Sequence, residues 1–234
     1  FKTLKMMVCL LICISSSPVI AQIQFEQVLP PPPAPQIIAD FEGVERSSIA
    51  FADVDGDNDQ DVLITGNNNS GQSIAKLYTN DGSGNFTELT GTPFDGVSGL
   101  IGNSSIAFAD VDGDNDQDVL ISGRNNSNQE IAKLFTNDGS GIFTEVTGTP
   151  FDGVNDSSIE FADVDGDGDQ DVLITGDNGS NNISKLYTND GSGNFSQVTG
   201  APFDGVSIGS IAFADVDGDN DQDVLITGSN NSFF

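Results

Sequence analysis

The 234-residue chain contains no histidine and no tryptophan, and its two cysteines, Cys9 and Cys13, both lie near the start of the sequence. Without histidine, the chain lacks the commonest general base and the usual zinc ligand. Without cysteine after residue 13, disulfides cannot stabilise the remainder of the chain. Residues 22–234 also show no pairing of a nucleophile with a base, so we expect a protein that is not an enzyme.

Basic residues are equally scarce: 7 Lys and Arg stand against 36 Asp and Glu, which gives a formal net charge of −29. Binding to nucleic acid or to an anionic membrane requires clusters of Lys and Arg, so we expect neither as a partner. Twenty of the acidic residues lie in four short segments that each run into Val-Leu-Ile. This pattern predicts ordered loops between strands, whereas a disordered acidic tail would have no such apolar continuation.

One acidic segment occurs four times. It reads FADVDGDNDQDVLITG from Phe51, FADVDGDNDQDVLISG from Phe108, FADVDGDGDQDVLITG from Phe161 and FADVDGDNDQDVLITG from Phe213. Successive copies start 57, 53 and 52 residues apart, in the range of β-propeller blades. A linear β-solenoid is the alternative, but its rungs are usually about half this length or less.

Each repeat contains four expected strands. In the first repeat these are residues 48–52, 61–65, 73–79 and 86–90, and the Asp-Gly sequence within residues 80–84 predicts a hairpin between the last two. The run Val62-Leu63-Ile64 does not alternate, so this strand should be covered on both faces, as in stacked blades. We therefore expect an all-β fold: a β-propeller of four-stranded antiparallel blades, with three full repeats plus a partial fourth, as a fragment of a larger propeller.

The N-terminal region predicts export. Lys2 and Lys5 precede the apolar residues 6–14, and Val19-Ile20-Ala21 resembles a cleavage site, so residues 1–21 are expected to be a signal peptide rather than a retained anchor. Residues 22–46 form a Pro-rich segment, and residues 47–234 form the repeat array. We expect a secreted protein, extracellular or at the cell surface, with no membrane span in the mature chain.

Two parts of the Pro-rich segment resemble later parts of the chain: the outer strand of the third repeat and the segment that leads into that repeat. Residues 24–28 (QFEQV) resemble residues 194–198 (NFSQV), and residues 38–44 (IADFEGV) resemble residues 149–154 (TPFDGV). These similarities predict that the mature N-terminus contributes a closing strand to the last blade.

The acidic segments predict metal binding, because alternating carboxylates repel one another unless a cation lies among them. In the first copy, Asp53, Asp55 and Asp57 can converge on an ion, while Asn58 takes a position that requires a left-handed backbone. Asp59 would offer its backbone carbonyl and Asp61 would complete the cage. Hard oxygen ligands at this density suit Ca²⁺ better than Mg²⁺, and an EF-hand is excluded because its twelfth position would be Ile64 rather than Glu.

These segments resemble the DxDxDGxxD calcium loops of FG-GAP repeats, as in the propellers of integrin α-subunits, and LYTNDGSGNF from Leu77 resembles the hairpin of FG-GAP/VCBS-type repeats. The resemblance covers residues 47–234 and implies about one Ca²⁺ per loop. Three copies depart from the motif, with Asn58, Asn115 and Asn220 in place of its glycine. The implied side-chain ligands are Asp53, Asp55, Asp57 and Asp61; Asp110, Asp112, Asp114 and Asp118; Asp163, Asp165, Asp167 and Asp171; and Asp215, Asp217, Asp219 and Asp223. The implied carbonyl ligands are Asp59, Asp116, Asp169 and Asp221.

Three further features bear on function. Lys76, Lys133 and Lys185 recur at one strand position, where we expect stems packed over the sheet and ammonium groups near acids, not catalytic bases. Tyr78, Phe135 and Tyr187 recur at another position and are expected to pack within blades instead of forming sugar platforms. The segments that differ most between copies are candidates for partner contact. They are residues 67–72, 124–130 and 177–182.

The sequence therefore predicts a calcium-binding propeller module that mediates adhesion by binding a protein or a glycan. A noncatalytic propeller portion of a larger exported hydrolase or lyase, or a structural spacer, remains as an alternative. The sequence ends midway through a repeat, which is why we expect a fragment.

Overall fold

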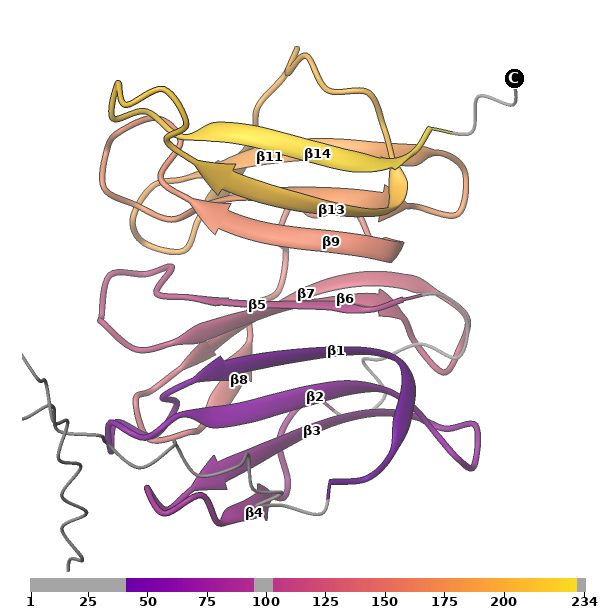
Figure 1. Cartoon of the computed structure of the whole chain (residues 1–234), viewed down its shortest axis with the longest axis vertical. Helices are drawn as coiled ribbons and strands as arrows, with labels where there is room; N and C mark the ends of the chain where they lie inside the picture. The colour runs from indigo at the N-terminus through magenta and orange to yellow at the C-terminus, as the bar shows by residue number, and fades with distance from the viewer. Residues whose placement is uncertain (1–40, 95–102, 231–234) are drawn as a thin grey trace, which may run out of the picture. The chain divides into compact units, whose positions relative to one another are not determined.

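The computed structural model describes residues 41–94 and 103–230, which form β-strands and loops without any helix (Figure 1). The chain divides into residues 1–36 and residues 37–234, and the described residues all belong to the second unit. The expected signal peptide, the polyproline run and the expected closing strand at residues 24–28 lie outside the described residues. None of the described segments could act as a helical membrane span.

Each repeat folds into its own antiparallel sheet, in which neighbouring strands pair in chain order. The first sheet contains β1 (Val44–Ala52), β2 (Asp61–Asn68), β3 (Ser73–Asn80) and β4 (Phe86–Leu89). The second contains β5 (Ser105–Ala109), β6 (Asp118–Arg124), β7 (Glu130–Asn137) and β8 (Phe143–Glu145). The third contains β9 (Asn155–Ala162), β10 (Asp171–Asp177), β11 (Asn182–Asn189) and β12 (Phe195–Gln197). The fourth has two strands, β13 (Ser207–Ala214) and β14 (Asp223–Ser229). The expectation of an all-β chain built from four-stranded antiparallel sheets is thus confirmed.

Two strands of the first repeat are longer than the sequence indicated. β1 begins at Val44 instead of residue 48, because pairing resumes beyond an irregularity between Glu45 and Ser48. β2 continues past residue 65 to Asn68, since Gly66 and Asn67 still pair with β3. The polar composition of residues 66–68 suggested a loop, but the backbone ladder extends through them.

The apolar run of the second strand is buried on both faces, as predicted. Leu63 belongs to a cluster shared with the second sheet, whereas Val62 and Ile64 belong to a cluster on the opposite face. In the second sheet, Val119 and Ile121 face the first sheet and Leu120 faces the third. Successive side chains of a strand point to opposite faces, so a sheet between two neighbours needs an apolar residue at every position.

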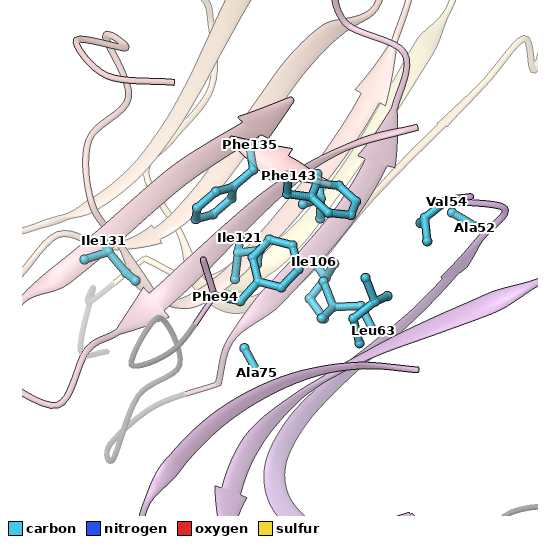
Figure 2. Close-up of a cluster of buried hydrophobic side chains, with 12 residues drawn as sticks. Ala52, Val54, Leu63, Ala75, Phe94, Ile106, Ile121, Ile131, Phe135 and Phe143 are labelled. Carbon is cyan, nitrogen blue, oxygen red and sulfur yellow. The ribbon is translucent and has the colours of Figure 1, made fainter. Parts of the chain in front are cut away.

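Aromatic residues in the connections lie against the sheet that follows them in the chain. The ring of Phe94 contacts Phe135 and Phe143 of the second sheet, each with centroids 5.0 Å apart (Figure 2). Phe151 contacts Tyr187 and Phe195 of the third sheet in the same way. Phe41 repeats the arrangement at Tyr78 and Phe86 of the first sheet, at 5.0 and 5.3 Å. The similarity between residues 38–44 and 149–154 therefore reflects a shared structural role, at least at its described end.

Candidate metal centre

The four acidic segments connect the first strand of each sheet to the second, and we refer to them as acidic turns 1 to 4. They are Asp53–Asp61, Asp110–Asp118, Asp163–Asp171 and Asp215–Asp223. In an antiparallel sheet this turn lies at the same end as the hairpin between the third and fourth strands. The hairpins are residues 81–85, 138–142 and 190–194. The acidic turn and the hairpin of one repeat can therefore contact each other.

The backbone of each turn curls around its first aspartate. Asp53 accepts hydrogen bonds from the amide of Gly56 to Oδ1 at 2.8 Å and from the amide of Asn58 to Oδ2 at 2.9 Å. Asn58 has φ of 68°, and the equivalent residues Asn115 and Asn220 have 72° and 74°. Gly168, which replaces Asn in turn 3, has φ of 96°. The prediction of a left-handed residue at this position is confirmed, and Asn is among the few non-glycine residues that accept it readily.

The last aspartate of turns 1 to 3 fixes the turn to its own sheet. Asp61 is fully buried and accepts hydrogen bonds from the amides of Val54 and Asn80, at 2.9 and 2.8 Å. Asp118 and Asp171 make the equivalent pair of bonds in turns 2 and 3. Burial raises the pKa of Asp118 to about 6, against the lowering effect of these bonds. Each carboxylate oxygen has two lone pairs, so these residues can still coordinate an ion.

Carboxylate oxygens from three residues converge in every turn, where one oxygen from each lies within 4.8 Å of the others. The groups are Asp53, Asp55 and Asp57; Asp110, Asp112 and Asp118; Asp163, Asp165 and Asp171; and Asp215, Asp217 and Asp223. The remaining predicted side-chain ligands, Asp61, Asp114, Asp167 and Asp219, lie in the same turns but outside these groups. Such a cluster could hold a metal ion, and its oxygen donors suit a hard divalent cation.

Two buried carboxylate oxygens support the interpretation that these clusters hold a cation. Oδ1 of Asp55 and Oδ1 of Asp112 are inaccessible to solvent and accept no hydrogen bond in the described part of the chain. Burial, and then the charges of Asp57 and Asp53, raises the pKa of Asp55; the pKa of Asp112 rises for equivalent reasons. A buried carboxylate oxygen without a partner is costly, and a cation at the cluster would remove that cost.

The side chains of the predicted carbonyl ligands lie where sequence reasoning had not placed them. Asp59 lies directly over Gly82 of its own hairpin, so closely that a side chain on Gly82 would collide with the carboxylate. Asp116 and Asp169 lie over Gly139 and Gly191 in the same way. The glycine of the recurrent Asp-Gly sequence is thus needed to make room for the carboxylate, whereas the sequence alone suggested only a tight turn there. Their role as carbonyl ligands stays a prediction.

The recurrent lysines form ion pairs. Lys76 lies 3.0 Å from both Glu42 and Glu88, and Lys133 lies 2.9 Å from Glu145. Lys185 pairs with Asp152, which raises the pKa of the lysine. The raised pKa makes Lys185 a poor base, and the ion pairs of all three lysines agree with the expected structural role. Tyr78, Phe135 and Tyr187 are buried in the aromatic contacts described above, so they pack within sheets as predicted.

These observations define an all-β repeat protein with an acidic turn in each repeat. A family model described as FG-GAP-like repeat matches residues 53–121, 114–174 and 163–226. The matches cover most of the chain, which therefore belongs to the FG-GAP-like repeat family. A search of curated proteins found no match.

Proposed function

We propose that this chain is part of a secreted, calcium-binding β-propeller module that binds a protein or a glycan at its surface. The observation that carries the proposal is the convergence of three carboxylates in each of the four acidic turns. Repeats of this family are typical of extracellular proteins, where millimolar calcium is available to weak sites. The low content of basic residues argues against nucleic acid as the partner.

Calcium would be held in each turn by the converging aspartates and by the aspartate that is fixed to the sheet. In turn 2 these are Asp110, Asp112 and Asp118, with Asp114 and the carbonyl of Asp116 available to complete the shell. When bound, the ion neutralises carboxylates that otherwise repel one another. The protein supplies the backbone hydrogen bonds that hold the turn in its curled form. The role we propose for the ion is to stabilise the fold and not to contact the partner.

A propeller is the architecture that the packing favours. Each four-stranded sheet packs face to face on the next through the same residues, such as Leu63 against Ile106 and Leu120 against Ile159. The exposed face of the fourth sheet presents Leu225, and the first strand of the first sheet presents Ile49 and Phe51. These are the residue types that meet at the interior interfaces, so further packing of the same kind would extend the array towards a ring.

The partner surface that we propose is formed by the loops between the second and third strands. These segments, residues 67–72, 124–130 and 177–182, lie at the end of each sheet opposite its acidic turn. Their tips are exposed and they differ in charge: Arg124 and Glu130 form an ion pair in the second repeat, whereas neutral residues occupy both positions in the first. Loops that vary on a constant scaffold commonly carry recognition.

The test is a glycan array and an extracellular-protein pull-down, both performed with the 234-residue protein in calcium and in EDTA. Binding in calcium that is lost when residues 124–130 are replaced by the loop of the first repeat would support the proposal. The replacement loop comes from the equivalent position of the same protein, and it removes the ion pair between Arg124 and Glu130 together with the hydrogen bond that Glu130 accepts from Asn155. Blank screens in calcium would contradict the binding role and favour a structural spacer.

A further inference from the structure

The acidic turns of the first two repeats are covered by the hairpin of the next repeat. Asn137, at the end of β7, donates a hydrogen bond from Nδ2 to the carbonyl oxygen of Val54 at 2.8 Å. Asn189, at the end of β11, donates the same bond to the carbonyl oxygen of Val111, also at 2.8 Å. Both bonds are buried, and each joins residues about 80 positions apart in the chain. They fix the peptide between the first two aspartates of the turn.

The same hairpins cover the two carboxylates of which one oxygen, Oδ1, accepts no hydrogen bond. A methyl group added to Gly141 would lie 3.8 Å from Cβ of Asp55, and one added to Gly193 would lie 3.7 Å from Cβ of Asp112. The oxygens Oδ1 of Asp55 and Oδ1 of Asp112 are the two buried, unpartnered turn oxygens. The neighbouring hairpin thus excludes water from one side of the carboxylate cluster without supplying it with a donor.

Turns 3 and 4 differ, because the fourth sheet has two strands and residues 41–94 and 103–230 contain no hairpin that lies on them. Val54 and Val111 are each 1% exposed, whereas the equivalent Val216 is 78% exposed. Asp165 and Asp217 are exposed, whereas Asp55 and Asp112 are partly buried. The four turns are nearly identical in sequence, but turn 4 also lacks a third strand of its own sheet among the described residues. The comparison that isolates the covering hairpin is therefore that of turns 1 and 2 with turn 3.

We propose that Asn137 and Asn189 are positioning residues for the ion sites of the preceding repeats, so that a turn covered by the next hairpin (turns 1 and 2) binds the ion more tightly than a turn that no described hairpin covers (turn 3 of the 234-residue protein). The inference rests on the proposed calcium binding and adds that the calcium affinity of one repeat depends on contacts from the next repeat. A residue of one repeat would determine how firmly its neighbour holds the ion, and the bound ion would in return strengthen the contact between the two sheets.

Two physical effects produce this difference in affinity. A carboxylate shielded from water attracts a divalent cation more strongly, because the local dielectric constant is lower. A turn whose backbone is already fixed loses less conformational entropy when the ion binds. Both effects act at turns 1 and 2, whereas no described hairpin supplies them at turn 3. By reciprocity, an ion that binds better to the covered turn must stabilise the covering contact equally.

Asn80 provides a matched control. It occupies the same position in the first repeat, but its Nδ2 donates to the carbonyl of Gln60 in its own repeat, at 3.3 Å. Replacement of Asn80 by alanine therefore breaks contacts within one repeat, including the bond that Oδ1 accepts from the amide of Gly84 at 3.1 Å, and leaves the covering contact from Asn137 in place. The backbone amide of Asn80, which donates to Asp61, is unchanged by the substitution.

The experiment is a calcium titration of the calcium-depleted 234-residue protein, followed by calorimetry and by the amide NMR signals of the turn glycines. Gly56, Gly113, Gly166 and Gly218 each donate to the first aspartate of their own turn, so each reports one site. We expect Gly56 and Gly113 to respond at lower calcium than Gly166. N137A should lower the calcium affinity of turn 1 by about fivefold and leave that of turn 2 unchanged. N189A should lower the affinity of turn 2 and leave that of turn 1 unchanged. A fivefold change is what the loss of one buried hydrogen bond is expected to cause.

The outcomes separate this inference from the proposed function. An N137A protein whose turn 1 binds calcium as tightly as in the wild-type protein, or a turn 3 that fills together with turns 1 and 2, would overturn the inference while leaving calcium binding intact. A titration without heat or shifts in any turn would overturn both. In each variant, the turn covered by the unmodified asparagine serves as an internal check that the protein is folded.

Discussion

The ring of Phe94 meets the ring of Phe135 edge to face, with centroids 5.0 Å apart and planes at 85°. Phe94 is fully buried although it lies in a connection between two sheets. Edge-to-face pairs are favourable beyond the area that they bury, so this residue joins the connection to the second sheet. Figure 2 shows it among Phe143, Ile106 and Ile121, at the centre of the core shared by the first two sheets.

Replacement of Phe94 by alanine should lower the free energy of unfolding by about 3–5 kcal/mol, the usual cost of removing a buried phenylalanine. The matched variant is Phe203→Ala, because Phe203 occupies the same place before the fourth sheet, in which the described residues up to 230 provide no third or fourth strand to pack against. That variant should cost less than about 2 kcal/mol. Urea denaturation followed by circular dichroism would measure both. Equal losses would show that the ring contacts do not set the cost.

Replacement of Leu120 by alanine should cost about 2–5 kcal/mol, because this side chain is fully buried between the second and third sheets. Leu225 is its equivalent in the fourth sheet and is 67% exposed. Leu225→Ala should change stability by about 0.5 kcal/mol or less. Thermal unfolding of the two variants provides the comparison. A large loss from Leu225→Ala would indicate that another surface covers the fourth sheet in solution.

Removal of calcium should lower the melting temperature sharply. Each site adds about 2.7 kcal/mol to stability when free calcium is 100 times its Kd, because the unfolded chain has no assembled site. EDTA should remove this gain and magnesium should restore it poorly, since magnesium demands a tighter octahedral shell. Scanning calorimetry would measure the shift.

The double variant Asp110→Asn and Asp112→Asn should keep only part of the calcium-dependent gain, because turn 2 loses two converging carboxylates. Asp204→Asn removes an exposed acid outside the turns and should leave the gain intact. Identical melting of the wild-type protein with and without EDTA would contradict a stabilising role for the ion.

The ion pair between Arg124 and Glu130 predicts a pH dependence of stability. The Arg124 guanidinium holds the pKa of Glu130 below its ordinary value. A lowered pKa in the folded state adds stability above the unfolded-state pKa, about 4.3, and that stability is lost as the pH falls through the folded value. At pH 7, Glu130→Gln should therefore cost about 1 kcal/mol, since both side chains are largely buried.

This difference should shrink as the pH falls below about 4. The control is Arg124→Gln, in whose background Glu130→Gln should have little further effect, and a double-mutant cycle from pH 3 to pH 7 would measure the coupling. A cost of Glu130→Gln that stays constant over this range would show that the charge of Glu130 is not responsible.

The fold was predictable wherever the determining interactions lie within one repeat. The convergence of the alternating aspartates, the two-sided apolar run at Val62–Ile64 and the left-handed position of Asn58 all follow from local backbone geometry, and the structure bears them out; the bound ion stays a prediction. The exact ends of β1 and β2 were not predictable, because ladder pairing extends into Gly- and Asn-rich residues. Polar composition alone does not stop a strand that has a partner.

Contacts between repeats were the part that the sequence could not indicate. Asn137 lies in a segment that reads only as a hairpin, and its partner Val54 is 83 positions earlier. Near-identical repeats give no sign of which neighbour a side chain contacts. The same difficulty applies to Phe94, which looks like part of a linker but completes the core of the following sheet. In both cases the information lies in the stacking of the sheets and not in the repeat itself.

Each four-stranded sheet depends on a phenylalanine that lies upstream of its first strand, so the folded unit begins earlier in the chain than the sequence repeat. Tyr78 and Phe86 are covered by Phe41, which precedes β1, just as Phe135 and Phe143 are covered by Phe94. A fragment that begins at Ser47 would therefore expose Tyr78 and Phe86 to water, whereas one that begins before Phe41 would keep the ring that covers them. Dissection, circular permutation or transplantation of these repeats should consequently place the cut upstream of the phenylalanine.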